Sequence, residues 1–300
     1  MKKGNGFNPT EIIFAATQNC NLHCRHCFVS REPQKLSSED AIRFMKSAKN
    51  SQIYKIGFSG GEPFLHLSFM TDVIKAAVQM EFCFDQIMTN GDWWKTPEEL
   101  RQTLCQIRDA GYDGKIGLSY DSFHNQDFER IKIFCKTVND IFDEENLTVQ
   151  TVIDETLSDQ ESDLLEKQLD ILNKNYIADI FIIPQTFLSE NPKAWKSKKW
   201  FKEDFCQGPG QILFVHSSGN IAPCCGFANE NPALFIGNIK EHDFQKVIEN
   251  AASSKLVQIC YTKGLSSLTK KAKKIGIKGK TSEICTFCDA VCKKASSFLD

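Results

Sequence analysis

The chain has 300 residues, of which 41% are hydrophobic and 25% are charged, and its formal net charge at pH 7 is −2. This composition is typical of a globular protein, and the length suits one large domain or one domain with an appendage. The near-neutral charge argues against a nucleic-acid partner, and no apolar run is long enough to cross a membrane. No signal-peptide core follows the basic N-terminus, so a cytoplasmic location is expected.

Apolar runs and helix-start signals alternate along the first two thirds of the chain. The apolar runs are typical of buried strands, and Ser37, Thr96 and Ser158 are predicted to cap three of the helices between them. Strand–helix units in series predict a parallel sheet with right-handed crossovers. The predicted strands are 11–17, 53–59, 84–89, 115–120, 147–153 and 179–183, and the predicted helices are 37–49, 68–80, 96–111, 125–142 and 158–173.

Three thiols lie within eight residues directly after the first predicted strand, at Cys20, Cys24 and Cys27. Such spacing lets a short loop hold three sulfurs at one corner of an iron–sulfur cube, which leaves one iron open to a ligand. This position is suited to an active site, because α/β folds place their active sites at the carboxyl ends of strands. A structural zinc site with His23 or His26 as the fourth ligand is the alternative.

A second motif, Gly60-Gly61-Glu62-Pro63, directly follows the second predicted strand. Glycines let the backbone approach a ligand closely, and a carboxylate can pair with an ammonium group. Together, the cysteine loop and this motif resemble the signature of radical S-adenosylmethionine (SAM) enzymes. The resemblance implies that the three cysteines of the loop hold a [4Fe-4S] cluster that binds SAM, and that the Gly-Gly-Glu-Pro segment binds the amino end of SAM.

The resemblance also implies an architecture. We expect an α/β fold in which residues 1–184 form an open, partial (β/α)6 barrel similar to three quarters of a TIM barrel. Residues 185–205 are expected to form a linker, and residues 206–300 are expected to form a small C-terminal iron–sulfur domain.

Polar residues at the carboxyl ends of the predicted strands are further site candidates. In radical SAM enzymes, groups at the matching strand ends contact the ribose and methionine parts of SAM, and the resemblance carries this role to Asn90, Ser119 and Asp121. The alternative for each is a capping or turn role, which Asn, Ser and Asp often have. His124 is expected to be a first-turn residue of the next helix rather than a catalytic group.

The chain has 13 cysteines, and seven of them lie beyond residue 205. In a reducing compartment they suggest metal sites rather than disulfides. Cys206, a predicted hairpin over residues 211–222, the sequence Pro-Cys-Cys and a late Cys-x2-Cys follow one another in a layout that resembles the auxiliary-cluster domain called SPASM, or its shorter twitch form. A zinc ribbon is the alternative. The resemblance implies one auxiliary [4Fe-4S] cluster with the ligands Cys206, Cys224, Cys285 and Cys288. Cys260 and Cys292 are the alternative candidates for a ligand.

The resemblance implies a reaction that begins when the open-iron cluster gives an electron to SAM. The resulting 5′-deoxyadenosyl radical takes a hydrogen atom from an unactivated C–H bond. Pro-Cys-Cys after a hairpin looks like the radical SAM peptide epimerases, which convert L- to D-residues in ribosomal peptides. We therefore expect a ribosomal precursor peptide as substrate, Cys225 as the hydrogen donor that quenches the substrate radical, and flavodoxin or ferredoxin as electron donor.

Several other interpretations stay open at the level of sequence. In the simplest alternative, Cys225 is a buried cysteine that neither binds a cluster nor takes part in the reaction. A radical SAM enzyme that crosslinks a ribosomal peptide through a carbon–carbon or thioether bond would oxidise the substrate radical rather than quench it. A sugar or aminoglycoside epimerase is a further candidate. The non-enzymatic alternative is an iron–sulfur or zinc-binding scaffold, which the colour of anaerobically purified protein would test first.

Overall fold

The structure is a computed structural model of the chain, and it describes residues 6–202 and 211–294. Cys206, an auxiliary-cluster ligand in the sequence prediction, lies outside the described residues. Within the two described segments, no helix combines the length and the hydrophobicity that a bilayer span requires.

The chain divides into two compact units. One consists of residues 14–42 and 55–185, and we call it the barrel unit. The other consists of the described parts of 1–13, 43–54 and 186–300, and we call it the C-terminal unit. The predicted domain boundaries stay predictions, and residues 43–54 and the described part of 1–13 belong to the C-terminal unit although they precede the predicted linker.

Strands and helices alternate along residues 11–183. The strands are β1 (Glu11–Ala15), β2 (Lys55–Phe58), β3 (Cys83–Thr89), β4 (Lys115–Ser119), β5 (Leu147–Val152) and β6 (Asp179–Ile183). The helices between them are α1 (Ser38–Ala48), α2 (Leu67–Gln79), α3 (Pro97–Asp109), α4 (Phe128–Phe142) and α5 (Asp159–Tyr176). Each strand and helix predicted for this region is present, with ends that differ by a few residues.

Side-chain caps explain where these helices begin. Ser158 and Glu161 form a reciprocal capping box at the start of α5. Helix α4 begins later than the predicted Asn125, because the Asp127 side chain accepts the N–H of Glu129 at 2.8 Å and takes the N-cap position. The other two predicted caps, Ser37 and Thr96, accept the N–H groups of Asp40 and Glu99.

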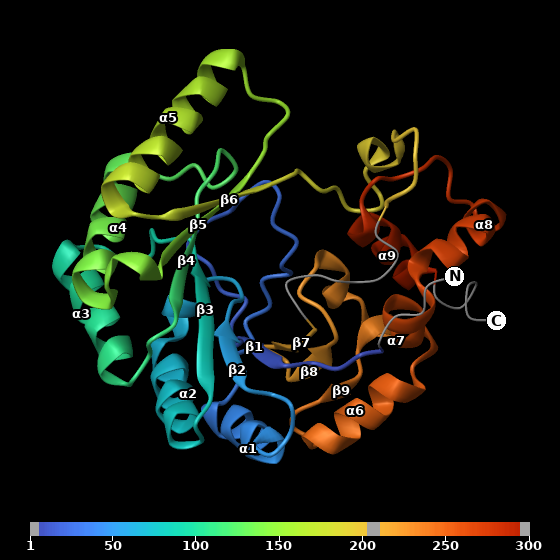
Figure 1. Cartoon of the computed structure of the whole chain (residues 1–300), viewed down its shortest axis with the longest axis horizontal. Coiled ribbons are helices and arrows are strands. Elements are labelled where there is room, and N and C mark those ends of the chain that lie inside the picture. Colours follow the sequence, from blue (N-terminus) through green and yellow to red (C-terminus); the bar gives the residue numbers. More distant parts are fainter. Residues whose placement is uncertain (1–5, 203–210, 295–300) are drawn as a thin grey trace. The chain divides into compact units, whose positions relative to one another are not determined.

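The strands of the barrel unit form a parallel sheet. Strands β2 to β6 are neighbours in the order β6-β5-β4-β3-β2, and β1 lies beside β2. Figure 1 shows α2 to α5 along one side of these strands. The side chains of Ile116, Leu118 and Val149, on β4 and β5, are completely buried. The predicted α/β fold with a parallel sheet is confirmed, and the carboxyl ends of its strands meet at one edge.

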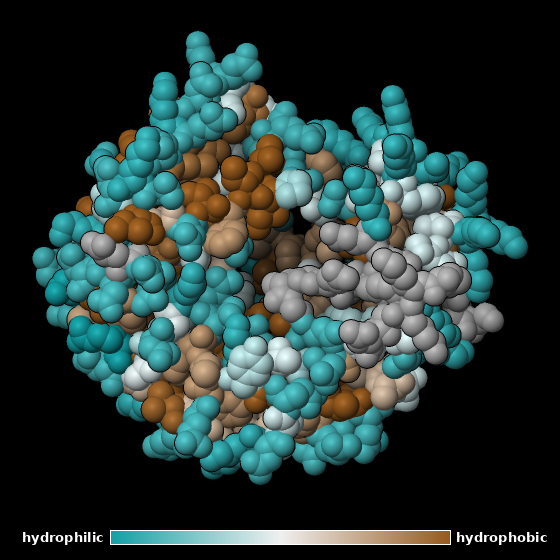
Figure 2. Space-filling view, in the orientation of Figure 1, coloured by the Kyte–Doolittle hydropathy of each residue, from teal (hydrophilic) through white to brown (hydrophobic). Residues whose placement is uncertain are grey.

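Strand β6 ends the strand order and carries exposed apolar side chains. Phe181 is 52% exposed and Ile182 is 64% exposed. Ile153, directly after β5, and Leu164, on α5, are exposed as well. Figure 2 shows apolar surface in the region of β6 and α5. The barrel unit thus presents apolar surface around its last strand.

The predicted hairpin over residues 211–222 is present in the C-terminal unit. Its strands are β7 (Ile212–His216) and β8 (Asn220–Ala222), and β9 (Gly237–Asn238) pairs antiparallel with β8. Gly219 lies in the turn with a φ of +91°, a conformation that favours glycine. The later helices are α6 (Phe244–Ser253), α7 (Lys255–Gln258), α8 (Thr269–Ala272) and α9 (Ile284–Lys293), and a π-helical turn spans Ile259–Lys263.

Candidate active site

The Gly-Gly-Glu-Pro motif after β2 is bonded to the segment that leads into the cysteine loop. The N–H of Gly61 donates to the carbonyl of Thr17 at 2.8 Å. The N–H of Glu62 donates to the carbonyl of Asn19, also at 2.8 Å. A Cβ at Gly61 would lie 2.3 Å from the Asn19 carbonyl oxygen, so this approach requires glycine. The motif therefore fixes the backbone just before Cys20.

We expect Gly61→Ala to disturb the cysteine loop and to lower the iron content of the purified protein. The added methyl group overlaps the carbonyl oxygens of residues 18 and 19, and the forced shift costs about 1–3 kcal/mol of unfolding free energy. Iron analysis and denaturant unfolding measure the two effects. Ser59→Ala is the matched control, because the Ser59 N–H keeps its 3.0 Å bond to the Phe14 carbonyl. Native iron content and stability in Gly61→Ala would contradict this role of the motif.

The Glu62 carboxylate is fully buried and is held by three donors from the chain. Oε1 accepts from the Thr89 hydroxyl at 2.8 Å and from the Phe64 N–H at 3.2 Å. Oε2 accepts from the Asn90 N–H at 2.9 Å. Burial raises the pKa of Glu62 to about 7, because these hydrogen bonds offset only part of the desolvation. Glu62 thus ties the end of β2 to the end of β3, and its pairing with the SAM ammonium stays a prediction.

Asn90, directly after β3, reaches the first cysteine of the loop. Its Nδ2 lies 3.6 Å from Cys20 Sγ and 3.0 Å from Asn21 Oδ1. The Leu22 N–H donates to the same sulfur at 3.4 Å. Burial raises the pKa of the Cys20 thiol, and the Leu22 N–H acts in the opposite direction. Two hydrogen-bond donors therefore converge on the Cys20 sulfur.

Asp121 follows β4 and uses both of its carboxylate oxygens inside the barrel unit. Oδ1 accepts from His124 Nδ1 at 2.7 Å and from the Phe123 N–H at 2.9 Å, and Oδ2 accepts from the Val152 N–H at 3.3 Å. The Asp121 side chain is only 1% exposed. These contacts favour a positioning role, and contact with SAM stays a prediction. Ser119 is half-buried at the end of β4, and its contact with SAM also stays a prediction.

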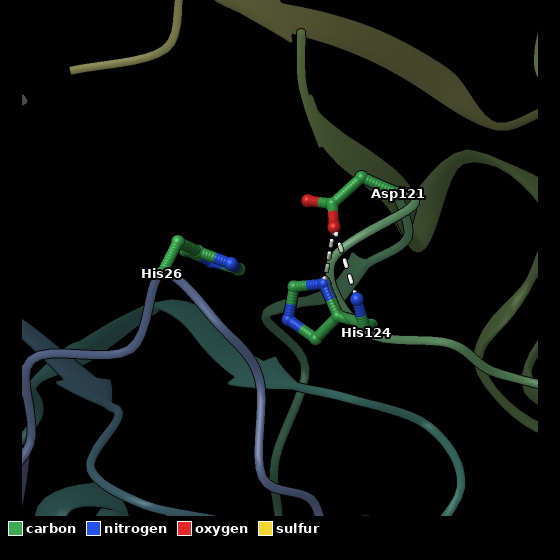
Figure 3. Close-up of side chains that lie close together, drawn as sticks. All are labelled: His26, Asp121 and His124. Carbon is green, nitrogen blue, oxygen red and sulfur yellow. Dashed lines mark hydrogen bonds and ion pairs between the residues drawn. The ribbon is translucent and has the colours of Figure 1, made fainter. Parts of the chain in front are cut away.

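His124 connects Asp121 to the second cysteine of the loop. Its Nδ1 is hydrogen-bonded to Asp121, and its side chain also hydrogen-bonds to Cys24. Burial lowers the pKa of an imidazole, but these two hydrogen bonds outweigh it and raise the pKa of His124 to about 9. His26, from the loop itself, packs edge-on against this ring with centroids 5.1 Å apart. Figure 3 shows His26 pointing toward the Asp121–His124 pair.

The ligand atoms of His26, Asp121 and His124 lie within 4.8 Å of one another, a spacing that suits a metal ion. The Asp121 carboxylate, however, already accepts hydrogen bonds from four N–H groups, and His124 Nδ1 carries one of them. A metal ion would compete for the same atoms. The geometry therefore favours hydrogen-bonded support of the cysteine loop over a separate metal centre.

A salt bridge joins the cysteine loop to the segment after β5. Arg25 Nη2 lies 3.2 Å from Asp154 Oδ2, and the Asp154 side chain is completely buried. The Ser122 hydroxyl donates to the same oxygen at 2.9 Å. Arg25 also lies over the Phe123 ring, 5.5 Å from its centroid. The sequence analysis singled out none of these residues, although the position of Asp154 just after a predicted strand is a signal for it.

The donor set of the loop fits an iron–sulfur cluster. Cys20, Cys24 and Cys27 offer three soft thiolate ligands at half-buried or exposed positions. Three ligands leave one iron open, which suits a cluster that binds SAM. The zinc alternative needs His23 or His26 as a fourth ligand, and the His26 ring packs against the His124 ring.

The C-terminal unit brings cysteines of the π-helical turn and of α9 into contact, and Cys224 lies near enough for its charge to act on Cys292. Cys288 Sγ lies 4.0 Å from Cys260 Sγ and 4.0 Å from Cys292 Sγ. Hydrogen bonds from Cys260 and Cys292 hold the pKa of Cys288 well below its usual range. The hydrogen bond to Cys288, burial and nearby charges that include Cys224 raise the pKa of Cys292. We call Cys224, Cys260, Cys288 and Cys292 the thiol group.

The predicted auxiliary ligands overlap only in part with the thiol group. Cys224 and Cys288 belong to it, and Cys206 lies outside the described residues. The Cys285 sulfur lies beside Gly226, 3.4 Å from the position that a Cβ there would occupy. The ligand set of an auxiliary cluster therefore stays a prediction.

The thiol group also contains Cys260 and Cys292, the two cysteines that the sequence analysis gave as alternative ligands. The local sequence gives an indication that Cys292 is a ligand. Cys285, Cys288 and Cys292 are spaced by three and four residues and so share one face of α9. Cys260 lies 28 residues before its partner Cys288, and a separation of that length gives no local pattern.

Two family models match the sequence. The model of the Radical SAM superfamily matches residues 15–154, which include the cysteine loop, the Gly-Gly-Glu-Pro motif and the strand ends described above. The model of the SPASM iron–sulfur cluster-binding domain matches residues 206–289. The second match includes three members of the thiol group, Cys224, Cys260 and Cys288.

Several known proteins are similar over nearly the whole chain. The putative peptide biosynthesis protein YydG of Bacillus subtilis is 23% identical over 96% of this chain and 93% of its own length. SuiB of Streptococcus suis, bound to SAM, has a TM-score of 0.50 and 16% identity over 93% of this chain and 77% of its own. The structure of anSMEcpe with bound AdoMet and a peptide has a TM-score of 0.57 and 14% identity over 97% and 96% of the two chains. At such identities the two structures show a shared fold.

The family matches agree with the chemistry of the two cysteine sites. The first site offers three thiolates and an open iron position, which accounts for a [4Fe-4S] cluster that binds SAM. The second offers a group of thiols for auxiliary iron–sulfur binding. The chain therefore contains a radical SAM domain followed by an iron–sulfur cluster-binding SPASM domain.

Proposed function

We propose that this radical SAM enzyme inverts a Cα centre in a ribosomally made precursor peptide, converting an L-residue to a D-residue. The name of YydG refers to peptide biosynthesis, and one structure of SuiB holds the precursor peptide SuiA. These names support a peptide substrate for the chain. The observation that carries epimerisation is the half-exposed thiol of Cys225, directly after Cys224 of the thiol group.

The first half of the proposed reaction takes place at the radical SAM site. When bound, SAM and its [4Fe-4S] cluster supply the 5′-deoxyadenosyl radical that takes the Cα hydrogen. Cys20, Cys24 and Cys27 hold the cluster. We infer that SAM lies against the backbone of Gly60 and the side chains of Glu62, Asn90 and Ser119. Gly61 and Asp121 position the elements around them.

Cys225 completes the inversion in this proposal. Its S–H bond breaks, a C–H bond forms on the opposite face of the Cα radical, and a thiyl radical remains on Cys225. One electron and one proton then restore the thiol. The electron comes from a reduced flavodoxin or ferredoxin, and the proton comes from solvent. The half-exposed position of Cys225, just beyond β8, supports hydrogen donation and the uptake of a solvent proton.

We infer that the thiol group holds the auxiliary [4Fe-4S] cluster. Its four cysteines match the number of thiolates that a closed cluster uses. The 4.0 Å distances from the Cys288 sulfur to those of Cys260 and Cys292 support these three members of the set. The alternative set from the sequence keeps Cys224 and Cys288 and adds Cys206 and Cys285. Cys225 belongs to neither set.

Product analysis in deuterated water tests the proposed epimerisation. The probe is a short precursor peptide encoded by a reading frame beside the gene for this enzyme. We expect the product to carry one deuterium, located at the Cα of a D-residue, because a thiol exchanges its proton with solvent before it donates. Acid hydrolysis followed by chiral amino-acid analysis with mass detection measures both properties.

The same experiment separates the alternative reactions. A crosslinking enzyme would give a product that has lost hydrogen and carries no solvent deuterium at carbon. A sugar or aminoglycoside epimerase would leave the peptide unchanged. A scaffold without turnover would cleave no SAM. Each of these results would contradict peptide epimerisation.

A further inference from the structure

Two side chains outside the ligand set reach the sulfurs of the cysteine loop from neighbouring strand ends. Asn90, after β3, places its Nδ2 3.6 Å from Cys20 Sγ. His124, beyond the end of β4, is hydrogen-bonded to Cys24. Iron is bound by the thiolates themselves, so neither contact is needed to complete the ligand set.

Both side chains are held in orientation by the chain around them. The Asn90 amide also donates to Asn21 Oδ1 at 3.0 Å, and its Oδ1 accepts the Asp92 N–H at 2.8 Å. This pattern directs the NH2 group toward the cysteine loop. Asp121 holds Nδ1 of His124 at 2.7 Å, which fixes the orientation of the ring. The two groups are therefore oriented before any cluster binds.

We propose that Asn90 and His124 are positioning residues that hydrogen-bond to the Cys20 and Cys24 sulfurs and raise the reduction potential of the SAM-binding cluster. A hydrogen bond to a ligand sulfur stabilises the reduced cluster more than the oxidised one, because the reduced cluster is more negative. Easier reduction favours the electron transfer that begins SAM cleavage. The inference depends only on the radical SAM cluster and not on the reaction of the substrate.

A redox titration of the SAM-binding cluster, followed by electron paramagnetic resonance, tests the proposal. Addition of SAM identifies the signal, since only the cluster with an open iron binds SAM. Asn90→Leu and His124→Phe remove the hydrogen bonds and nearly keep the volumes. We expect each variant to make reduction about tenfold less favourable at a given potential, which is a shift of about −59 mV for one electron. The double variant should show about the sum of the two shifts, because each side chain contacts a different sulfur.

Two further variants control for changes in packing. His23→Phe removes an exposed imidazole beside Cys24 in the same loop, and its potential should stay native. His124→Gln keeps a polar hydrogen-bonding group, and its potential should lie closer to native than that of His124→Phe. Unchanged or raised potentials in Asn90→Leu and His124→Phe, with native iron content, would overturn the proposal.

If His124→Phe loses iron, the potential of His124→Gln becomes the measurement that tests the proposal. Retention of iron together with a near-native potential in His124→Gln supports the proposal. Loss of iron in both variants would overturn it for His124, because the imidazole would then serve folding rather than tuning. None of these outcomes depends on peptide epimerisation, so failure here and failure of the proposed function are distinguishable.

Discussion

Cys225→Ala is expected to keep both clusters and to cleave SAM, but to lose inversion of the peptide. Abstraction of the Cα hydrogen needs only the radical SAM site, whereas return of a hydrogen atom needs the thiol. The stranded substrate radical should accumulate enough to be seen by electron paramagnetic resonance, or be reduced without inversion. We expect Cys225→Ser to behave in the same way, because an O–H bond is too strong to give its hydrogen atom to a carbon radical.

The controls for Cys225 separate donation from cluster binding. Cys83→Ala removes an exposed cysteine at the start of β3 and should leave inversion native. Iron loss in Cys225→Ala would make Cys225 a ligand and would move the donor role to Cys224. Full inversion by Cys225→Ala with native iron would show that the thiol-donor proposal is wrong.

Simultaneous replacement of Cys20, Cys24 and Cys27 by Ala is expected to abolish SAM cleavage and to remove about half of the iron. The native protein should hold about eight iron atoms per chain after anaerobic reconstitution, from two cubes of four. The triple variant loses the cluster with the open iron and should retain about four. Iron and sulfide analysis together with a SAM-cleavage assay measures both effects.

A complementary variant assigns the remaining iron. Cys288→Ala removes the central member of the thiol group and should lose the other cube of about four iron atoms. Cys83→Ala should keep the native count. About four iron atoms in the native protein would contradict the auxiliary cluster, and a colourless protein with zinc would contradict both clusters.

Features that depend on neighbouring residues could be predicted from the sequence alone. The strands and helices of residues 11–183 follow from runs of apolar residues and from caps such as Ser158 with Glu161. The three predicted ligands of the first cluster lie within eight residues, so a single loop is enough to bring them together. The Gly-Gly-Glu-Pro motif is equally local. Its position directly after a strand was enough to recognise it, together with the cysteine loop, as one signature.

The meaning of individual site residues depended on contacts between distant segments. The sequence analysis took the glycines of Gly-Gly-Glu-Pro to approach a ligand, whereas Gly61 lies against the backbone of Asn19. Asp121 has the position of a ligand-binding residue, but its carboxylate is occupied by N–H groups of the residues that directly follow it and of Val152 on β5. Local pattern identifies a polar residue at a strand end, but it does not reveal which partner has already satisfied that residue.

By itself, the sequence determined the α/β fold, the loop of Cys20, Cys24 and Cys27, and the cysteine-rich C-terminal part. Only the tertiary structure decided which residues support these sites. Asn90 lies 70 residues from Cys20, and Asp154 lies 129 residues from Arg25, yet each pair is in contact. The physical reason is that a parallel sheet brings the carboxyl ends of its strands to one edge, so residues far apart in the chain meet there through packing that no local spacing encodes.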